Sequence, residues 1–328
     1  MAVNKAKQRL LTTGRPPLAK AKTASLSSKA TRTLIRSHHT LHKQLANAVS
    51  HGDEKKAEAI RAQINAHGGL ESYQLASTLG QSSDRGGDSS KLLVEWLKPD
   101  FDQARAGKRN LRLLEVGALS TKNAISAVDC VDMRRIDLKS RQEGIEEMDF
   151  MKLRVPLEEA EKYDVISLSL VLNYVPSASG RGDMLRRTVD FLRVSRYAVD
   201  DEDACHGSFI PCVFLVLPLP CVSNSRYMDY NRLEEIMGSL GYRVVQRKKT
   251  TKLYYELYKW SKRKKEDVAR SSTGDFKKVE LRSGKTRNNF SITLEGHNHR
   301  SVSRGTAKIR GQDSFHHSPM SPPGTMPD

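Results

Sequence analysis

Two acidic motifs in the middle of the chain have the spacing of a nucleoside-binding site. The first is LLEVGALS, residues 113–120, in which an apolar run contains Glu115 and is followed by Gly117. A glycine at such a turn lets a ligand approach the backbone closely, because it has no side chain. Twenty residues after that glycine, Asp137 ends a second apolar run, in RRIDL. A carboxylate at that position can accept hydrogen bonds from both hydroxyls of a ribose.

Two further motifs follow these in order. MDFM, residues 148–151, offers Asp149 for the exocyclic amine of an adenine and Phe150 for its face. DVISLS, residues 164–169, runs through Ser167 to a small polar tip. Each motif alone is weak, because an acidic residue after a strand often only caps a helix. Four motifs in order, each at the carboxyl end of an expected strand, predict one site, since ligands bind at that edge of open α/β sheets.

The first motif also discriminates between nucleotide cofactors. The pyrophosphate of NAD requires the pattern G-x-G-x-x-G, whereas this turn has only Gly117. The short methionine chain of S-adenosylmethionine does not require this glycine pattern at the turn. Antiparallel strands expected late in the chain are also typical of a methyltransferase sheet. We therefore expect S-adenosylmethionine to be the cofactor.

The segments around these motifs alternate between strand and helix patterns. Apolar runs that suit buried strands are Leu111–Val116, Val131–Leu138, Tyr163–Leu170 and Phe209–Leu217. Helical patterns are Lys91–Leu97, Met184–Val194 and Asp229–Leu240, and later strand candidates are Tyr242–Gln246, Lys252–Tyr258 and Asn289–Leu294. Because parallel strands need crossover helices, the order predicts an α/β fold with a doubly wound sheet of the class I methyltransferase (Rossmann-like) type.

The flanks of this core have a different composition. Residues 1–30 are expected to form a disordered basic tail, and residues 295–328, with little apolar content, a second disordered tail. Residues 31–98 are expected to form a helical extension with a loop that closes over the cofactor. Within it, apolar residues at helical spacing over Thr31–Ala66 predict a helical hairpin. The methyltransferase domain is expected over residues 99–294.

Positive charge is concentrated in two segments. The chain carries a formal net charge of +17. Residues 1–50 hold ten Lys/Arg and no Asp/Glu, and residues 243–287 hold sixteen Lys/Arg against five Asp/Glu. This distribution suits a polyanionic partner, because contacts with phosphates release counterions. A solvated tail, or a nuclear-import signal at residues 262–265, would produce the same pattern, and these alternatives stay open.

Other protein classes are disfavoured by composition. The chain has no apolar run of about eighteen residues, so no transmembrane helix is expected, and its first twenty residues lack the pattern of a secretory signal. The four cysteines, Cys130, Cys205, Cys212 and Cys221, do not have the spacing of a zinc site. We expect a monomer in a reduced compartment, with no metal and no membrane.

A polar, glycine-rich loop precedes the first helix of the expected core. In GQSSDRGGDSS, residues 80–90, Arg85 with the neighbouring glycines and serines could hold an anion. A flexible linker with a helix cap at Ser89 or Ser90 would use the same residues. The sequence leaves both interpretations open.

Together the motifs resemble the fungal 25S ribosomal RNA adenine-N1 methyltransferase family, which also includes an animal S-adenosylmethionine sensor of nutrient signalling. The resemblance covers roughly residues 68–294 and extends to RYMDYNRLEEIMGSLGY and RNNFSITL. It implies a cofactor site in which Gly117 lies under the methionine and ribose, Asp137 binds the ribose, Asp149 and Phe150 bracket the adenine, Ser167 closes the site, and Arg85 meets the methionine carboxylate.

The resemblance also implies a reaction, methylation of N1 of an adenine in large-subunit rRNA. The substrate would be this rRNA or a pre-ribosomal particle, and the expected location is the nucleus, in the nucleolus. N1 carries its own lone pair, so positioning can suffice without a strong base. Asn173 and Tyr174, just past a strand, are candidates to read and stack on the unstacked adenine. Packing of Leu170–Val175 into the core is the alternative. A non-catalytic cofactor sensor is the alternative function, but docking on a protein would not need the basic segments.

Overall fold

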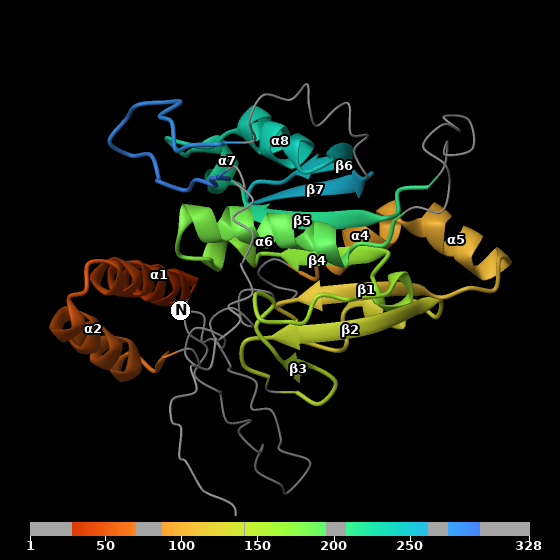
Figure 1. The fold of residues 1–328 in the computed structure, drawn as a ribbon, viewed down its shortest axis with the longest axis horizontal. Coiled ribbons are helices and arrows are strands. Elements are labelled where there is room, and N and C mark those ends of the chain that lie inside the picture. The colour runs from red at the N-terminus through yellow and green to blue at the C-terminus, as the bar shows by residue number, and fades with distance from the viewer. Residues whose placement is uncertain (1–27, 70–86, 141, 195–207, 262–274, 296–328) are drawn as a thin grey trace, which may run out of the picture. The chain divides into compact units, whose positions relative to one another are not determined.

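The computed structural model describes residues 28–69, 87–140, 142–194, 208–261 and 275–295. Within these ranges, seven strands form one sheet (Figure 1). The strands are β1 (Leu111–Val116), β2 (Val131–Asp137), β3 (Glu146–Glu147), β4 (Val165–Ser169), β5 (Cys212–Pro218), β6 (Tyr242–Lys249) and β7 (Leu253–Trp260). Their order across the sheet is β3-β2-β1-β4-β5-β7-β6.

Only one strand runs against the others. β1 pairs in parallel with β2 and β4, and β4 pairs in parallel with β5. β7 lies antiparallel between β5 and β6. The central strands β4 and β5 are buried along almost their whole length, as strands covered on both faces must be. This order, with its antiparallel seventh strand, is that of a class I methyltransferase sheet and confirms the predicted fold class.

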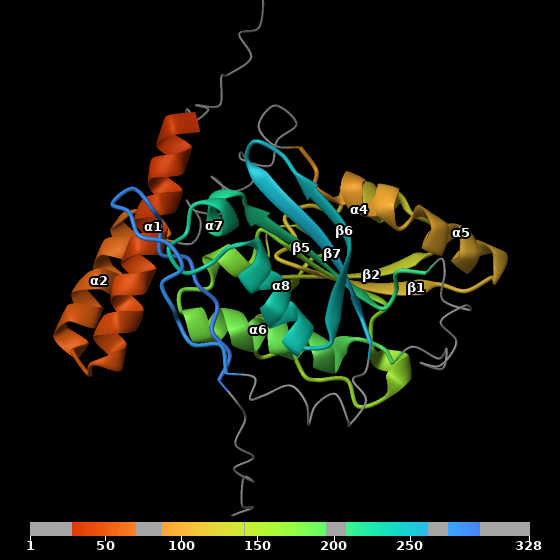
Figure 2. The same cartoon turned by 90° about the horizontal axis from the view of Figure 1, so that it is seen from above.

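Helices cover both faces of the sheet (Figure 2). α4 (Ser90–Trp96) and α5 (Lys98–Ala106) lie on one face, and α6 (Ala178–Phe191) and α8 (Tyr230–Ser239) on the other. The core under α4 and α5 contains Leu93 and Phe101 packed with Phe214. The core under α6 and α8 contains Leu185 packed with Leu215. Because neighbouring strand residues point to opposite faces, Phe214 lies in the core under α4 and α5, and Leu215 lies in the core under α6 and α8.

Most of the predicted elements are confirmed within a few residues, and two differ. The helix predicted over Met184–Val194 begins earlier, because the Ser177 side chain accepts a hydrogen bond from the Gly180 N–H and caps α6 there. The strand predicted over Asn289–Leu294 is wrong. That segment makes only isolated bridges, one of them between Phe276 and Leu294, and it is not part of the sheet.

The predicted helical hairpin is confirmed. α1 (Ser28–Ser50) and α2 (Glu54–Ala66) pack on each other around a small core of their own. Asp53 begins α2 by accepting a hydrogen bond from the Lys56 N–H at 3.1 Å. The two tails expected to be disordered fall almost entirely outside the described residues, and no helix within the described ranges is both long and apolar enough to span a membrane.

Residues 275–295, here called the strap, run over α6 and the short helix α7 (Pro220–Ser223). Arg282 fastens the strap by donating hydrogen bonds to four backbone carbonyls, those of Val222, Ser223, Ser225 and Met228. Asn288 donates to the Pro220 carbonyl at 2.6 Å, and the Thr293 N–H donates to the Ala178 carbonyl at 3.0 Å. The strap is therefore held by hydrogen bonds to backbone carbonyls. Every residue type has such a carbonyl, so these acceptors do not depend on side-chain identity.

The closest approach of the strap is at Gly182 in α6. A Cβ atom there would lie 1.9 Å from the Thr293 carbonyl oxygen, so Gly182→Ala must displace the strap. We expect this variant to lower the free energy of unfolding by about 2 kcal/mol, as overpacking does. The control is Gly238→Ala in α8, where a Cβ would meet nothing within 4 Å. That change should stabilise by about 0.5–1 kcal/mol. Equal effects in urea unfolding would contradict the close contact.

Candidate functional site

The turn after β1 is shaped by Gly117. Its φ of +75° lies in the left-handed region, and a Cβ atom there would be 2.6 Å from Cγ2 of Val171. The N–H groups of Gly117 and Ala118 both donate to the Ile136 carbonyl, at 2.8 and 3.1 Å. The turn is thus fastened to the end of β2 and packed against Val171, two residues after β4, and only glycine fits there.

Glu115 lies beneath this turn on the face covered by α4. It is in register with Arg135 and Ser167, so the three side chains share that face. Asn123 Nδ2 donates to its Oε1 at 2.8 Å, and Arg135 Nε lies 3.9 Å from its Oε2. Among the described residues, this buried Oε2 has no hydrogen-bond partner. Burial raises the pKa of Glu115 to about 6, although Asn123 and Arg135 both oppose the shift.

This raised pKa gives a testable pH dependence. Between about pH 4.5, its usual value, and 6, the folded state holds a proton that the unfolded state has lost, so stability falls as pH rises. The shift corresponds to about 2 kcal/mol. Without cofactor, Glu115→Gln should therefore gain about 2 kcal/mol relative to wild type between pH 4.5 and 7, measured by urea unfolding. A stability difference between the two proteins that stays constant over this range would contradict the raised pKa of Glu115.

Asp137 and Asp149 lie close together at the ends of β2 and β3. The Asp137 carboxylate accepts a hydrogen bond from the Lys139 N–H at 3.0 Å, and its carbonyl accepts one from the Met148 N–H at 2.8 Å. Asp149 Oδ1 accepts from the Met151 N–H at 2.9 Å. Both acids therefore order their own turns, and these turns bring them to the same edge of the sheet.

The aromatic ring between these turns points inward. Phe150 is 2% exposed, and its ring centroid lies 5.2 Å from that of Phe191 in α6. The exposed apolar side chains that follow the two acids are Leu138, next to Asp137, and Met151, two residues after Asp149, at 59% and 38% exposure. Sequence reasoning did not identify these exposures, because a single leucine or methionine after a strand carries no signal of its exposure.

Ser167 lies inside β4, two residues before its end, and is 5% exposed. At the edge itself, Ser169 Oγ lies 2.7 Å from Ser89 Oγ. Ser89 therefore bonds β4 rather than capping α4 with its side chain. Asp88 holds the same loop by accepting the Ala124 N–H at 2.5 Å, at the start of η1 (Ala124–Ala127). Arg85 lies outside the described residues.

Asn173 and Tyr174 belong to η3 (Leu172–Tyr174), a single turn directly after β4. The chain bends at Leu170, whose φ is +59°, and the turn ends before α6 begins. Asn173 Oδ1 is buried and has no hydrogen-bond partner among the described residues. Tyr174 is half-buried. Because Val171 contacts Gly117, this turn lies next to the β1 turn at the carboxyl edge of the sheet.

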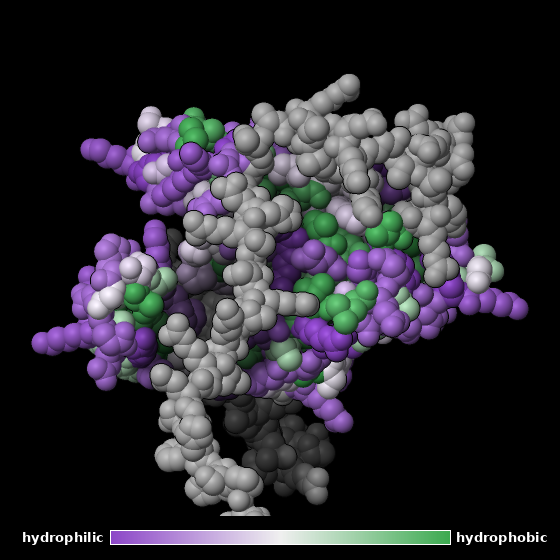
Figure 3. Space-filling view, in the orientation of Figure 1, coloured by the Kyte–Doolittle hydropathy of each residue, from purple (hydrophilic) through white to green (hydrophobic). Residues whose placement is uncertain are grey.

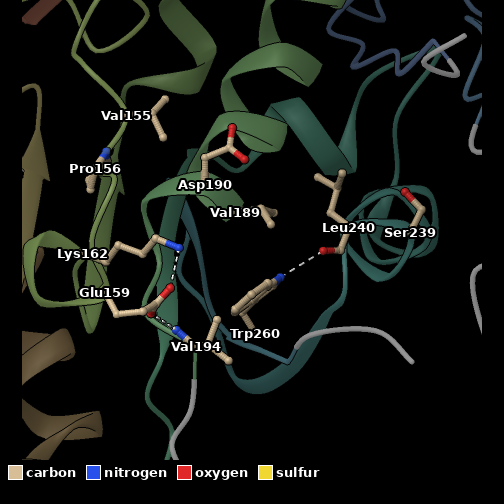
Figure 4. Close-up of a pocket in the computed structure, with 10 residues that line it drawn as sticks. All are labelled: Val155, Pro156, Glu159, Lys162, Val189, Asp190, Val194, Ser239, Leu240 and Trp260. Atoms are coloured by element: carbon tan, nitrogen blue, oxygen red, sulfur yellow. Dashed lines mark hydrogen bonds and ion pairs between the residues drawn. The ribbon is translucent and has the colours of Figure 1, made fainter. Parts of the chain in front are cut away.

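A surface pocket of about 630 Å³ lies at the opposite edge of the sheet, where β4 begins and β7 ends (Figure 4). Its charged groups are largely engaged, with Lys162 Nζ 2.7 Å from Glu159 Oε1 and the Val194 N–H donating to Glu159 Oε2 at 2.9 Å. The Trp260 indole donates to the Leu240 carbonyl. None of the predicted site residues lines this pocket, and the described residues contain no cluster suited to a metal ion.

Comparison with known proteins adds the family. The family described as 25S rRNA (adenine(2142)-N(1))-methyltransferase, Bmt2, matches residues 58–292. A Saccharomyces cerevisiae protein named 25S rRNA (adenine(2142)-N(1))-methyltransferase is 39% identical over 238 residues, 72% of this chain and 63% of that protein. The chain thus spans less than two thirds of that relative's length. A Schizosaccharomyces pombe 25S rRNA adenine-N(1) methyltransferase is 34% identical over 262 residues, 79% of this chain and 89% of that protein.

Among solved structures, an S-adenosylmethionine-dependent methyltransferase from Clostridium acetobutylicum aligns with a TM-score of 0.38 at 9% identity, covering 58% of this chain and 99% of the other. The family match covers the whole sheet, including every described residue predicted for the cofactor or for the adenine. The chain belongs to the 25S rRNA (adenine(2142)-N(1))-methyltransferase family, Bmt2.

Proposed function

We propose that this protein is an S-adenosylmethionine-dependent methyltransferase that methylates N1 of an adenine in 25S rRNA. The observation that carries the proposal is that Val171, against Gly117, leads into the turn with the buried, unpartnered Asn173 Oδ1, at one edge of a class I methyltransferase sheet in a chain of this family. The names of both relatives support the same reaction and favour an enzyme over a non-catalytic sensor.

The residues at this edge fit the cofactor. Gly117 leaves a space that any Cβ would fill, and the Glu115 carboxylate beneath it has an oxygen without a donor, suited to the methionine ammonium. Asp137 lies where a ribose would offer two hydroxyls. Leu138 and Met151 expose apolar surface for the adenine, with Asp149 beside them for its amine. We assign the cofactor site to these six residues, with Ser167 packed below the edge.

When bound, S-adenosylmethionine supplies a methyl group on a positively charged sulfur. The chain's own task is then to hold the target adenine in line with that methyl group. Asn173 Oδ1 can accept a hydrogen bond from the adenine 6-amino group, and the half-buried Tyr174 can stack on the ring. Because N1 carries a free lone pair at neutral pH, these residues need not remove a proton before transfer.

The proposed substrate and place of action follow from the same reaction. We infer that the protein acts on 25S rRNA, free or in a pre-ribosomal particle, and hence in the nucleolus. The basic segments at residues 1–50 and 243–287 support a polyanionic partner.

The decisive test uses 25S rRNA from a host that lacks the gene. The rRNA is incubated with the full-length protein and S-adenosylmethionine, and then probed by primer extension, because a methyl group on N1 blocks base pairing and stops reverse transcriptase. We expect a new stop at one adenine, matching a stop in wild-type rRNA. If wild-type rRNA and rRNA from the deletion host give identical stops, the proposed reaction is wrong.

A further inference from the structure

Lysines lie over two tyrosines at the start of α8, outside the candidate site. Lys249 Nζ lies 6.0 Å from the ring centroid of Tyr230, and Lys278 Nζ lies 4.2 Å from that of Tyr227. The two lysines come from different segments, since Lys249 ends β6 and Lys278 belongs to the strap. Two separate parts of the chain therefore place positive charge against neighbouring aromatic rings.

Both segments lie at the carboxyl edge of the sheet. β6 and β5 are each antiparallel to β7, so β6 runs in the same direction as β5 and its hairpin tip is at the carboxyl edge. The Leu219 N–H donates to the Lys252 carbonyl at 2.8 Å, which fixes that tip beside the end of β5. Asn288 fixes the strap to Pro220, in the same connection. β4, whose continuation carries Asn173, is the next strand (Figure 1).

The lysines of these segments form an exposed group, here called the basic ledge, consisting of Lys248, Lys249, Lys252, Lys277, Lys278 and Lys285. Within the described part of the chain, no carboxylate lies within 4.0 Å of Lys249, Lys278 or Lys285. By contrast, Arg247 in the same hairpin is paired with both Glu234 and Glu256. In Figure 3 hydrophilic side chains predominate over the strap, although its Val279 and Leu281 are 53% and 40% exposed. The charges of Lys249, Lys278 and Lys285 are thus left for an external anion.

We propose that the basic ledge binds the backbone of a single-stranded stretch of the RNA substrate and leads it to Asn173. This inference rests on the proposed function. Lysines beside Tyr227 and Tyr230 suit alternating phosphates and bases, because single strands are held by basic grooves and aromatic platforms together. An acidic protein would match the charges but would leave the rings unused. A single strand is also what the chemistry requires, since N1 of adenine is covered in a base pair.

The test compares two double variants of the full-length protein. In Lys249→Ala/Lys278→Ala, one phosphate contact is lost from each half of the ledge. We expect affinity for a short single-stranded RNA of mixed sequence to fall on the order of 20-fold at about 0.1 M salt. The slope of log K against log salt should become shallower by about 1.4, because each contact with a single strand accounts for about 0.7. Cofactor affinity, measured by calorimetry, should stay at the wild-type value.

The matched control is Lys98→Ala/Arg109→Ala, which removes two exposed cations near the amino edge and should bind the RNA as wild type does. The proposed role of the basic ledge in RNA binding is wrong if Lys249→Ala/Lys278→Ala keeps wild-type RNA affinity. It is also wrong if the control variant loses as much RNA affinity. A distinct result separates the two proposals. If the ledge variant loses RNA affinity while wild type gives no primer-extension stop on 25S rRNA, the ledge stands and the proposed reaction fails.

Discussion

Asp137→Ala is expected to lower the affinity for S-adenosylmethionine by at least about 100-fold. A carboxylate that accepts hydrogen bonds from both ribose hydroxyls contributes about 1.5 kcal/mol or more through each, and about 3 kcal/mol corresponds to a factor of about 100. Asp137 is half-buried at the end of β2, and its backbone carbonyl holds Met148. Alanine keeps that carbonyl, so the link to Met148 should survive, although the hydrogen bond from the Lys139 N–H is lost. Calorimetric titration of the full-length protein measures the effect.

The matched control for this variant is Asp132→Ala. Asp132 is an exposed acid on the same strand, hydrogen-bonded by Asn110 Nδ2 at 3.0 Å, near the amino edge. It should leave cofactor affinity unchanged, because it lies at the far end of β2. If Asp137→Ala binds as tightly as the control, the ribose is held elsewhere and the assignment of this edge fails with it.

The doubly wound parallel sheet and the position of Asp137 at the end of a strand could be predicted because both follow from local patterns. An apolar run that ends in an acidic residue is visible in sequence, and parallel strands bring such ends to one edge. The left-handed turn at Gly117 was foreseeable for the same reason, since glycine is the residue that adopts it without strain. These features depend on residue type and on spacing along the chain, both of which a single sequence displays.

The orientation of side chains could not be predicted in this way. Phe150 was expected against adenine, but its ring packs on Phe191, which lies 41 positions later in the chain. Leu138 and Met151 provide the exposed apolar surface instead. Asn289–Leu294 likewise resembled a strand in sequence, yet it belongs to the strap, which Arg282 holds through carbonyls and which runs over α7. Each outcome depends on contacts between distant segments, which periodicity does not encode.

Asn173 makes a specific prediction about the methyl-transfer step, because its buried Oδ1 has no hydrogen-bond partner within the described part of the protein. A buried amide oxygen without a donor costs about 1–3 kcal/mol, so a residue kept in this state is expected to meet its partner in a complex. For Tyr174 beside it the sequence left stacking and core packing open, and its half-buried position does not decide between them. Asn173 therefore gives the sharper test of the transfer step.

We expect Asn173→Ala to lower kcat for methylation of 25S rRNA about 100-fold, while cofactor affinity stays within about twofold of wild type. The loss arises because the adenine is no longer held in line with the methyl group, and misplacement by about 1 Å can cost this much. Asn173→Asp should recover part of the rate, since an aspartate oxygen can still accept from the 6-amino group. Single-turnover methylation with tritiated S-adenosylmethionine separates this step from RNA binding.

The stability of Asn173→Ala gives an independent check on this role. Since the Oδ1 is unsatisfied in the free protein, removing it should leave the free energy of unfolding unchanged or raise it by about 1 kcal/mol. A variant that is more stable but slower would be characteristic of a residue retained for catalysis. If Asn173→Ala instead methylates 25S rRNA at the wild-type rate, η3 is only a packed turn and the adenine is read by other residues.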